Sequence, residues 1–549
     1  MTTEPEAAIA GLKSQRSLAF DALSTAWHFR LQIAVVCGVG FLSVALGPDN
    51  NWDLRYYHLY APWAYLHGRY LYDVGPAQEQ GFLNPMADFL FYALASSSLN
   101  ESPRIVAFIM GAVHGINAVL VLAIASHVLR PPGIRERATL RTVAFLIGIS
   151  GAGFISLLGT TTNDLVNSIF VLGSLLGVLK VAEREDERAV WRGFAWSGLA
   201  IGIAVGLKNT AAVFVPGLGL IALIAAARRG AAGASIAFGA AAVLGFLGVA
   251  GHHLLTLWRD FGNPVFPFLN QIFQSPYYEP EPLRDARFLP RDFWQLMGYP
   301  FYWAKTNSYL VSEPPFRDWR GAVAYVAIAA GLLRLAASHV FKGARRDGAF
   351  AQTSGLGLVL IFVIVSYFSW ELGFGIYRYA LPLEMLTGVV TMGALIWLLE
   401  AGRTRVVVAL ALLTVVATTT VYLDWGRGSY GDRYVDVRVP ALPRNSVVLI
   451  ATWDPVAYFI PFAEPTAQFL GINNNYLELS QNNKLATEVK HVMRTPGRPK
   501  FVLSVGEFNS DALNSLLKEF DLRLSASPCE PIRSNLEEQA LSLCPIAAN

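Results

Sequence analysis

The sequence has few charged residues for its size. Asp, Glu, Lys and Arg make up 15% of its 549 residues, whereas hydrophobic residues make up 54%. A soluble protein of this composition would lack the polar side chains that it needs to cover its surface. The formal net charge is only +3, which gives no argument for binding to nucleic acid. A soluble globular protein and a nucleic-acid-binding protein are therefore both disfavoured.

The motifs of several enzyme classes are also missing. The chain contains no zinc-ligand spacing, Walker loop, dinucleotide-binding fingerprint or nucleophile elbow. It has no internal repeat with a clear period and no low-complexity linker. No single motif therefore identifies the reaction.

Cysteine is scarce, with three residues in the chain. Cys37 lies inside the first long apolar run, where it can serve as packing. Cys529 and Cys544 lie near the C-terminus, in a segment that we expect outside the cytoplasm. They could form a disulfide in an oxidising compartment or remain two free thiols, because spacing alone does not fix connectivity.

Long apolar runs dominate the chain up to about residue 423. Most of them are about 17–25 residues long, which is enough to cross a hydrocarbon core of roughly 30 Å. With a mean hydropathy of +0.40, the pattern predicts a polytopic α-helical membrane protein with about eleven spans. The polar segment 1–30 lacks the features of a cleavable signal. The predicted spans are 31–47, 104–129, 142–158, 164–181, 194–207, 210–227, 233–252, 320–337, 355–370, 380–399 and 405–423.

Basic residues alternate between the short loops and indicate an orientation. The basic loops follow spans two, four, six, eight and ten, and segment 1–30 is basic as well. Lys and Arg accumulate in short cytoplasmic loops, so we expect the N-terminus in the cytoplasm and the C-terminus outside. The clusters are Arg135/Arg137/Arg141, Lys180/Arg184/Arg188/Arg192, Arg228/Arg229, Lys342/Arg345/Arg346 and Arg403/Arg405.

The composition changes near residue 424, which predicts a second domain. Short β-branched runs at 446–450 and 500–504 alternate there with helical patterns, as in a small α/β domain. We therefore expect a membrane domain over 31–423 and an extracytoplasmic α/β domain over 424–549. Two long outer loops, 48–103 and 253–319, are rich in aromatic residues, which favours helices along the membrane surface.

Asp53 is the main candidate for catalysis. It follows the first span, and Asp53, Tyr57 and Ala61 recur every four residues, which places them on one face of a predicted helix. An aspartate at this position can cap the helix. If it faces a cavity, it can instead act as the general base that takes a proton from an attacking hydroxyl.

Further polar residues lie on the same predicted outer side. Asn84 starts a helix with the following proline, and Asp88 could bind substrate or face water. Asn163 and Asp164 occupy a very short loop at the head of the fourth span. Asp164 could cap that span, although acids at a membrane edge often have a function. Together with Asp53 it could bind a divalent cation or a sugar hydroxyl.

Lys208 and His252 interrupt apolar segments at this side. Lys208 could extend to lipid headgroups, or it could hold the phosphate or diphosphate of a lipid-linked substrate. His252 lies beside His253 at the outer end of span seven. Neighbouring residues on a helix point about 100° apart, so the two histidines seldom share a metal; one of them could contact substrate.

Arg378 is the only positive residue in its loop. A guanidinium binds phosphate through two parallel hydrogen bonds, and the flanking Tyr377 and Tyr379 could hold its plane. Alternatively, Arg378 pairs with Glu371 or Glu384 for structural reasons.

In this order, these residues resemble the motifs of the GT-C superfamily of glycosyltransferases, which includes the protein O-mannosyltransferases and the aminoarabinose lipid A transferases. The resemblance covers roughly residues 31–400. The chain departs from the pattern at Leu54, where many relatives carry Glu, so no role that depends on that Glu carries over. The matching segments are Asp53-x-x-x-Tyr57-x-x-x-Ala61, Asn84-Pro85-Met86, Gly206-Leu-Lys208-Asn-Thr-Ala, Gly262-Asn-Pro-Val-Phe-Pro267 and Tyr377-Arg378-Tyr379-x-x-Pro382.

The resemblance implies an inverting transferase of the bacterial inner membrane that uses a polyprenyl-phosphate sugar outside the cytoplasm. Arg378 and Lys208 would hold the donor phosphate, Asp53 would activate the acceptor hydroxyl, and the C-terminal domain would cover the site. The acceptor would be a glycan, lipid or protein of the cell envelope.

Two alternatives stay open. One is an O-antigen ligase or polymerase, which uses diphosphate-linked glycans and arginines of a large outer loop. This alternative is compatible with Arg284, Arg287 and Arg291. A lipid or sugar transporter would require midplane charges and often an internal repeat, and the sequence has neither.

Overall fold

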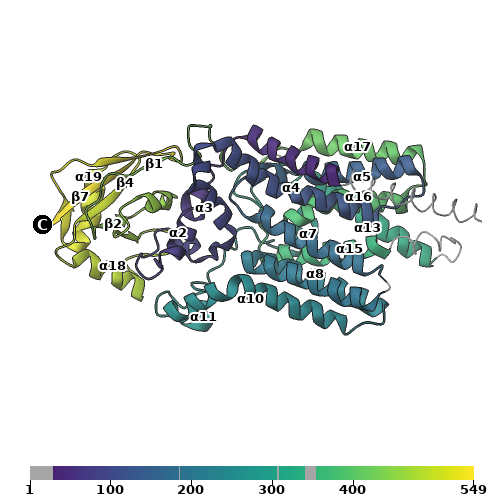
Figure 1. The fold of residues 1–549 in the computed structure, drawn as a ribbon, viewed down its shortest axis with the longest axis horizontal. Helices are drawn as coiled ribbons and strands as arrows, with labels where there is room; N and C mark the ends of the chain where they lie inside the picture. The colour runs from purple at the N-terminus through teal and green to yellow at the C-terminus, as the bar shows by residue number, and fades with distance from the viewer. Residues whose placement is uncertain (1–28, 185, 306–307, 341–353, 549) are drawn as a thin grey trace, which may run out of the picture.

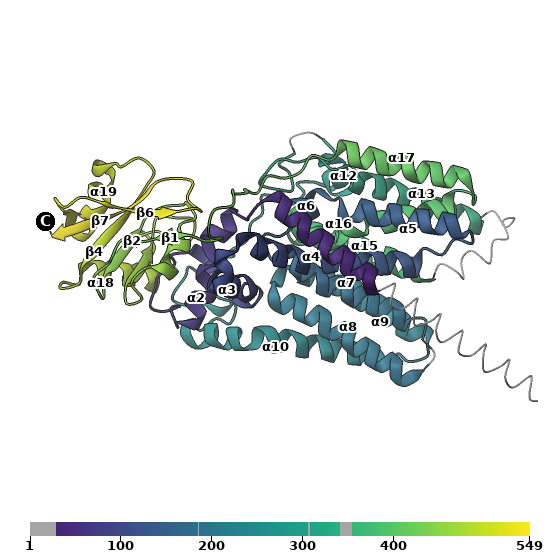
Figure 2. The ribbon, with the colours of Figure 1, turned by 45° about the horizontal axis from the view of Figure 1, so that its top comes forward.

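The computed structural model describes residues 29–548, except 185, 306–307 and 341–353. Most of segment 1–30, and the basic cluster at 342–346, lie outside the described residues. A helical bundle and a sheet domain occupy opposite ends of the longest axis, and the short helices α2 (Tyr60–Leu66) and α3 (Phe89–Ala95) lie between them (Figure 1 and Figure 2).

Eight helices among the described residues are long and apolar enough to cross a membrane. Three others, α5 (Ile134–Ile149), α13 (Arg320–Val340) and α17 (Arg403–Thr419), overlap the remaining expected spans. The expected polytopic helical fold is confirmed. The eight are Phe29–Leu46, α4 (Pro103–Val128), α7 (Asp164–Val181), α8 (Glu187–Leu207), Asn209–Arg228 with α9 (Val215–Arg228), α10 (Ala234–Phe261), α15 (Ser354–Gly373) and Tyr377–Leu398 with α16 (Leu381–Leu398).

The third span differs from the expectation of one helix over 142–158. Helix α5 ends at Ile149, and a separate short helix, α6, covers Ala152–Ser156. The break places the first amides of α6 against a buried carboxylate: Gly153 N and Phe154 N each donate to Glu384 at 2.8 Å. Hydropathy does not detect such a break because both halves are apolar.

The described basic segments meet at one end of the bundle. Arg130 pairs with Glu183 at 2.9 Å, Arg229 donates to the Ala182 carbonyl at 2.9 Å, and Arg405 pairs with Glu136. These contacts join the loops that follow α4, α7 and α9, and the first turns of α5 and α17. Asp164 starts α7 at the other end, and an 18-residue helix is about 27 Å long.

The C-terminal domain is a mixed sheet with two helices, α18 (Lys484–Arg494) and α19 (Ser510–Leu517). Its strand order is β1-β6-β7-β4-β2-β3, and β5 also pairs with β7. Strand β2 is parallel to β3 and β4, whereas β4, β5 and β6 are antiparallel to β7. The strands are β1 (Val437–Arg438), β2 (Val447–Ile450), β3 (Gln468–Gly471), β4 (Lys500–Val505), β5 (Leu522–Leu524), β6 (Glu530–Ser534) and β7 (Leu541–Ala548).

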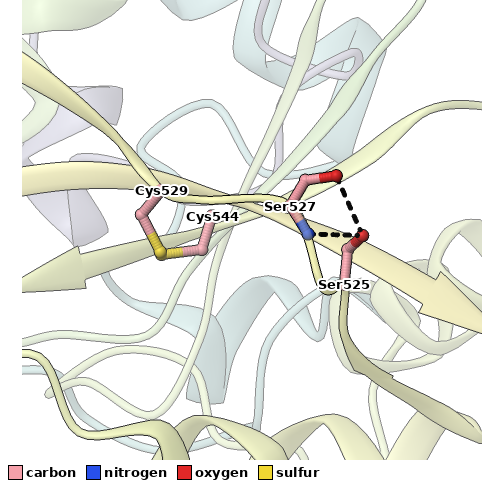
Figure 3. Close-up of a disulfide and its surroundings, with 4 residues drawn as sticks. All are labelled: Ser525, Ser527, Cys529 and Cys544. Atoms are coloured by element: carbon pink, nitrogen blue, oxygen red, sulfur yellow. Dashed lines mark hydrogen bonds between the residues drawn. A yellow bond between two sulfur atoms is a disulfide. The ribbon is translucent and has the colours of Figure 1, made fainter.

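Cys529 and Cys544 form a disulfide (Figure 3). Cys529 directly precedes β6 and Cys544 lies within β7, so the bond ties neighbouring strands of the sheet. The sequence left open a disulfide or two free thiols, and the structure has the disulfide.

The first outer loop completes the edge of this sheet. Val74 bridges Leu470 of edge strand β3, with Val74 N donating to Phe469 O at 2.9 Å and Gly471 N donating to Val74 O at 2.7 Å. The buried Asp73 accepts from Phe469 N and pairs with Arg69, whose guanidinium also binds the Pro465 carbonyl. An exposed strand edge is a site for unwanted pairing, and this loop covers it.

The second outer loop contributes short helices at the same end. They are α11 (Asn270–Phe273) and α12 (Phe293–Tyr302). Phe293 and Trp294 at the start of α12 are 62% and 79% exposed, as expected for aromatic residues in the headgroup layer.

Helices α8 and α10 approach each other backbone to backbone. A Cβ built on Gly202 would lie 2.0 Å from the Ala242 carbonyl oxygen, and one on Gly198 would lie 2.0 Å from that of Phe238. Glycines allow this separation because any side chain would push the helices apart.

Gly202→Val is therefore expected to destabilise the bundle by about 1–3 kcal/mol, which is typical of overpacking. Thermal melting of the detergent-solubilised protein measures it. Gly239→Val on α10 is the matched control, because a Cβ there meets nothing within 4 Å. Equal melting temperatures for the two variants would contradict this account of the packing.

Candidate active site

Asp53 lies at the end of the bundle opposite to the described basic loops and pairs with Arg378. Asp53 Oδ2 is 2.5 Å from Arg378 Nη1, and each side chain is 15% exposed. The expected helix begins differently: a π-helical turn covers Leu54–His58 before α2, and the Asp53 side chain makes no capping hydrogen bond. The carboxylate is thus directed at Arg378 rather than at the backbone.

Arg378 lies in the turn that precedes α16. Its guanidinium carbon is 5.4 Å from the ring centroid of Tyr379 and 5.4 Å from that of Trp425. Cations are attracted to aromatic faces at such distances. The alternative pairing of Arg378 with Glu371 or Glu384 is wrong for this structure, because Asp53 takes that place.

Lys208 follows α8 and reaches the same aromatic ring. Its Nζ is 2.6 Å from Asp164 Oδ1 and 5.0 Å from the Tyr379 centroid. Lys208 and Arg378 therefore lie within about 10 Å of each other, with Tyr379 between them. Asp164 is the first residue of α7, and its carboxylate contacts the lysine rather than a helix amide.

Asp88, His58 and Asn163 form a second group beside the first. Asp88 Oδ1 is 2.6 Å from His58 Nδ1 and 2.5 Å from Asn163 Nδ2. Asp88 and His58 are 3% and 0% exposed, so Asp88 does not face water. Asn163 has a positive φ of 36°, a conformation that asparagine tolerates better than most residues, and this turn brings its amide to Asp88.

Neighbouring positive charges determine the pKa of Asp53. Burial raises the pKa of Asp53, but the nearby positive charges of Arg378, His58 and Lys208 outweigh it and hold the pKa below its ordinary value. Tyr57 is 6% exposed. Burial together with the negative charges of Asp53 and Asp88 raises the pKa of Tyr57, so its hydroxyl keeps its proton.

Three buried polar atoms around these residues have no hydrogen-bond partner within the described chain. They are Arg378 Nε, Asp164 Oδ2 and His58 Nε2. Buried polar groups are normally paired because an unpaired one costs free energy. The arrangement can therefore still bind one ligand with both donors and acceptors.

Three of the expected site residues do not join this group. Asn84 donates to the carbonyls of Gly206 and Val249 at 2.7 and 3.3 Å, so it anchors the first outer loop to α8 and α10. Tyr377 donates to Glu384 at 2.5 Å and does not hold the plane of Arg378. His252 is exposed and contacts the Tyr65 hydroxyl.

Two buried residues of the site, His58 and Asp49, were not predicted from the sequence. Asp49 accepts hydrogen bonds from Thr161 N at 2.7 Å and Thr161 Oγ1 at 2.8 Å, which fixes the loop before Asp53 against the loop before Asp164. Asp49 could have been found as a second acid, four residues before Asp53 in the same segment. No comparable signal marked His58 within its aromatic segment.

The residues present do not fit a divalent cation. Asp53 and Asp164 are each bound by a cationic side chain. Across the described residues, no group of three His, Cys, Asp or Glu side chains gathers to hold a metal ion.

An apolar cavity of about 280 Å³ lies between α13, α15 and α16. Tyr377 and Ala380, which flank Arg378 and Tyr379 in sequence, belong to its wall. The rest of the wall is largely aliphatic and aromatic, including Ile328, Leu332 and Val363. The cavity therefore borders the segment that carries Arg378.

Comparison with known proteins now identifies the family. Residues 84–366, just over half of the 549, match the family described as glycosyltransferase family 87. The chain belongs to glycosyltransferase family 87. The expected class, a membrane glycosyltransferase of the GT-C type, is confirmed.

One solved structure aligns along nearly the whole family 87 chain. It is the crystal structure of ArnT from Cupriavidus metallidurans bound to undecaprenyl phosphate, with 12% identity, 94% of this chain and 98% of that chain covered, and a TM-score of 0.39. A likeness this weak carries no argument about the site. No curated protein matches at a significant level.

Glu79 is a half-buried acid outside the Asp53 group of this family 87 enzyme. It lies in the first outer loop near Tyr56, Tyr278 and Tyr476, the last of which belongs to the C-terminal domain. Its Oε2 has no partner within the described residues, and Gln80 donates to its Oε1 at 3.1 Å. Burial raises the pKa of Glu79 to about 6, with a smaller contribution from the charge of Asp285.

This shift predicts a pH dependence of stability. The folded protein holds the Glu79 proton to a higher pH than the unfolded chain, so ionisation through pH 6 destabilises the fold by about 2 kcal/mol. Glu79→Gln should gain melting temperature relative to the wild type as pH rises from 5 to 7. A difference between the two proteins that is constant across this range would show that Glu79 is not the titrating group.

Proposed function

We propose that this enzyme transfers a sugar from a polyprenyl-phosphate donor to an acceptor hydroxyl, with inversion, at the extracytoplasmic face of the bacterial inner membrane. The observation that carries the proposal is the convergence of Asp53, Arg378 and Lys208 around Tyr379. One carboxylate for the acceptor and two cations for a phosphate are the groups that this reaction requires.

The donor phosphate would bind to Arg378 and Lys208. Arg378 has a buried Nε without a partner, and Lys208 uses one of its three N–H donors on Asp164. Charge-assisted hydrogen bonds of this kind are the strong ones for phosphate. The neighbouring apolar cavity supports a lipid-linked donor, because part of a prenyl chain can lie there while its phosphate reaches Arg378.

Asp53 would be the general base. The acceptor oxygen attacks the anomeric carbon as its proton passes to Asp53, and the bond from that carbon to the phosphate oxygen breaks. The electron pair of that bond stays on the polyprenyl phosphate, whose added negative charge Arg378 and Lys208 stabilise. His58, Asp88 and Asn163 lie where they can orient sugar hydroxyls.

Donor binding would also make Asp53 a stronger base. In the resting arrangement the charge of Arg378 lowers the pKa of Asp53 against the effect of burial. A phosphate that draws Arg378 away removes this effect and adds a negative charge nearby, and both changes raise the pKa. Proton affinity would then be highest when the donor is bound.

The sidedness of the proposal depends on the charge distribution. The described basic loops meet at the end of the bundle opposite to Asp53, which places Asp53 outside if the basic end is cytoplasmic. On this orientation the C-terminal domain lies outside the cytoplasm. Its contact with the first outer loop would let it cover the site or help to select the acceptor.

A diphosphate-using ligase has less support. Arg284 donates to the carbonyls of Leu372 and Gly373 at 2.8 and 2.9 Å, which satisfies the C-terminal end of α15. Arg287 pairs with Asp285 at 2.7 Å. Arg284 and Arg287 therefore each have a partner other than the Asp53 group.

Asp53→Asn should lower kcat with polyprenyl-phosphate sugars by at least about 100-fold, because a general base contributes on that order. The assay is transfer of labelled sugar by the purified protein. Glu136→Gln is the matched control: it also breaks a largely buried ion pair, with Arg405, at the opposite end of the bundle. Full turnover by Asp53→Asn would remove Asp53 from the mechanism.

Lys208→Gln should mainly raise KM for the donor, by roughly 10- to 100-fold, as expected for a lost hydrogen bond to a charged group. Lys305→Gln is the control, since Lys305 also lies over a tyrosine ring, 5.1 Å from the Tyr302 centroid, but outside the Asp53 group. An unchanged KM in Lys208→Gln would assign that lysine to structure alone.

A further inference from the structure

A groove of about 380 Å³ lies between α7 and α8, far from Asp53. Lys180, Arg184 and Arg192 line it together with Trp196. Lys180 is near the last residue of α7, whereas Asp164 is its first. Sixteen helical residues separate them, about 24 Å along the axis, so the groove opens at the basic end of the bundle. It plays no part in the proposed reaction.

The charges at the groove favour an anion. Lys180, Arg184 and Arg192 are exposed, and none forms an ion pair with a described acid. Glu183 pairs with Arg130, and Asp186, which also lines the groove, accepts from Ala189 N to cap α8. Three cations and one carboxylate leave this concave surface with a positive charge, which attracts a phosphate.

Small residues line the deeper part of the groove: Gly173, Gly177, Gly193 and Ser197, whose hydroxyl donates to the Gly193 carbonyl at 2.8 Å. Gly173 lies on α7, seven residues before Lys180, which is about 10 Å further into the bundle. A Cβ built on Gly173 meets nothing within 4 Å, so the groove stays open at this depth. Trp196 is 68% exposed at the groove, and Trp residues prefer the boundary between headgroups and acyl chains.

We propose that this groove binds one anionic phospholipid from the leaflet at the basic end. Its phosphate lies against Lys180, Arg184 and Arg192, and the first part of one acyl chain passes Gly173. The axial distance of about 10 Å between Lys180 and Gly173 matches a ligand with a charged head and an apolar tail. A free phosphate would use the cations but not the apolar slot.

The topological bias of basic residues does not explain the groove. Arg135, Arg228 and Arg403 are also exposed at the basic loops, but they do not line it. Basic pockets between transmembrane helices bind anionic headgroups. Membrane topology accounts for the positive charge at this end of the bundle, and the groove is a separate lipid site at the same end.

Native mass spectrometry of the full-length protein in mild detergent tests the proposal. The protein is titrated with phosphatidylglycerol alone, with phosphatidylcholine alone, and with phosphatidylglycerol in the presence of glycerol phosphate. We expect one phosphatidylglycerol to bind on the order of tenfold or more tightly than phosphatidylcholine. Glycerol phosphate should not compete at equal concentration, and competition by it would overturn the choice of a lipid.

Two sets of variants locate the site. The triple variant Lys180→Gln, Arg184→Gln, Arg192→Gln should lose on the order of 10- to 100-fold in affinity for phosphatidylglycerol. The triple variant Arg135→Gln, Arg228→Gln, Arg403→Gln makes the same change in charge on the same face and should keep its affinity. Equal losses in the two variants would show that the lipid follows surface charge rather than the groove.

Gly173→Leu tests the apolar slot with every charge retained. It should lower phosphatidylglycerol affinity at least fivefold and leave the melting temperature close to that of Gly239→Leu, a control that also starts from an open position. Undiminished affinity in Gly173→Leu would overturn the proposed position of the acyl chain. The readout is binding, so it is independent of whether the proposed transferase reaction is correct.

Discussion

The ion pair between Asp53 and Arg378 is the contact on which the active-site arrangement depends. It joins residues 325 positions apart, one after the first membrane helix and one before α16. Both side chains are 15% exposed, and a buried charge without its partner would be costly. Formation of this pair therefore requires the first outer loop to dock on the late helices. Tyr379 follows Arg378 directly, so the same contact determines where Lys208 finds its aromatic neighbour.

Other hydrogen bonds, none of which involves Arg378, hold the segments around the Asp53–Arg378 pair in place. Asp49 binds Thr161, Asn84 binds the carbonyl of Gly206, and Arg427 donates to the carbonyls of Ser156 and Leu158 at 2.8 Å each. These contacts fix the segments that carry Asp53, Asp164 and Lys208 relative to one another. Groups whose positions are set before the substrate binds need little rearrangement during the reaction. Asn84 was expected at the substrate, but its contribution is to this framework.

Sequence patterns predicted the spans and the common side of Asp53, Asp164, Lys208 and Arg378, because hydropathy and Lys/Arg bias depend on the membrane alone. They did not predict the partner of Arg378. Glu384 is closer in sequence, but the amides of α6 and the Tyr377 hydroxyl occupy its oxygens. That arrangement requires the break after α5, which leaves no trace in hydropathy. His58 was missed for a related reason: its burial results from packing of the first outer loop rather than from local sequence.

An acid that stabilises the fold through an ion pair is a weak base while the pair persists. The positive charges around Asp53 lower its pKa although burial raises it, so in the resting arrangement Asp53 has little tendency to take a proton. In the proposed reaction, the donor phosphate competes with Asp53 for Arg378, and the aspartate gains proton affinity as it loses its partner. The same arginine would then both bind the donor and control the base. This coupling requires Arg378 to lie within reach of both groups, which is the geometry that its contacts with Asp53, Tyr379 and Trp425 define.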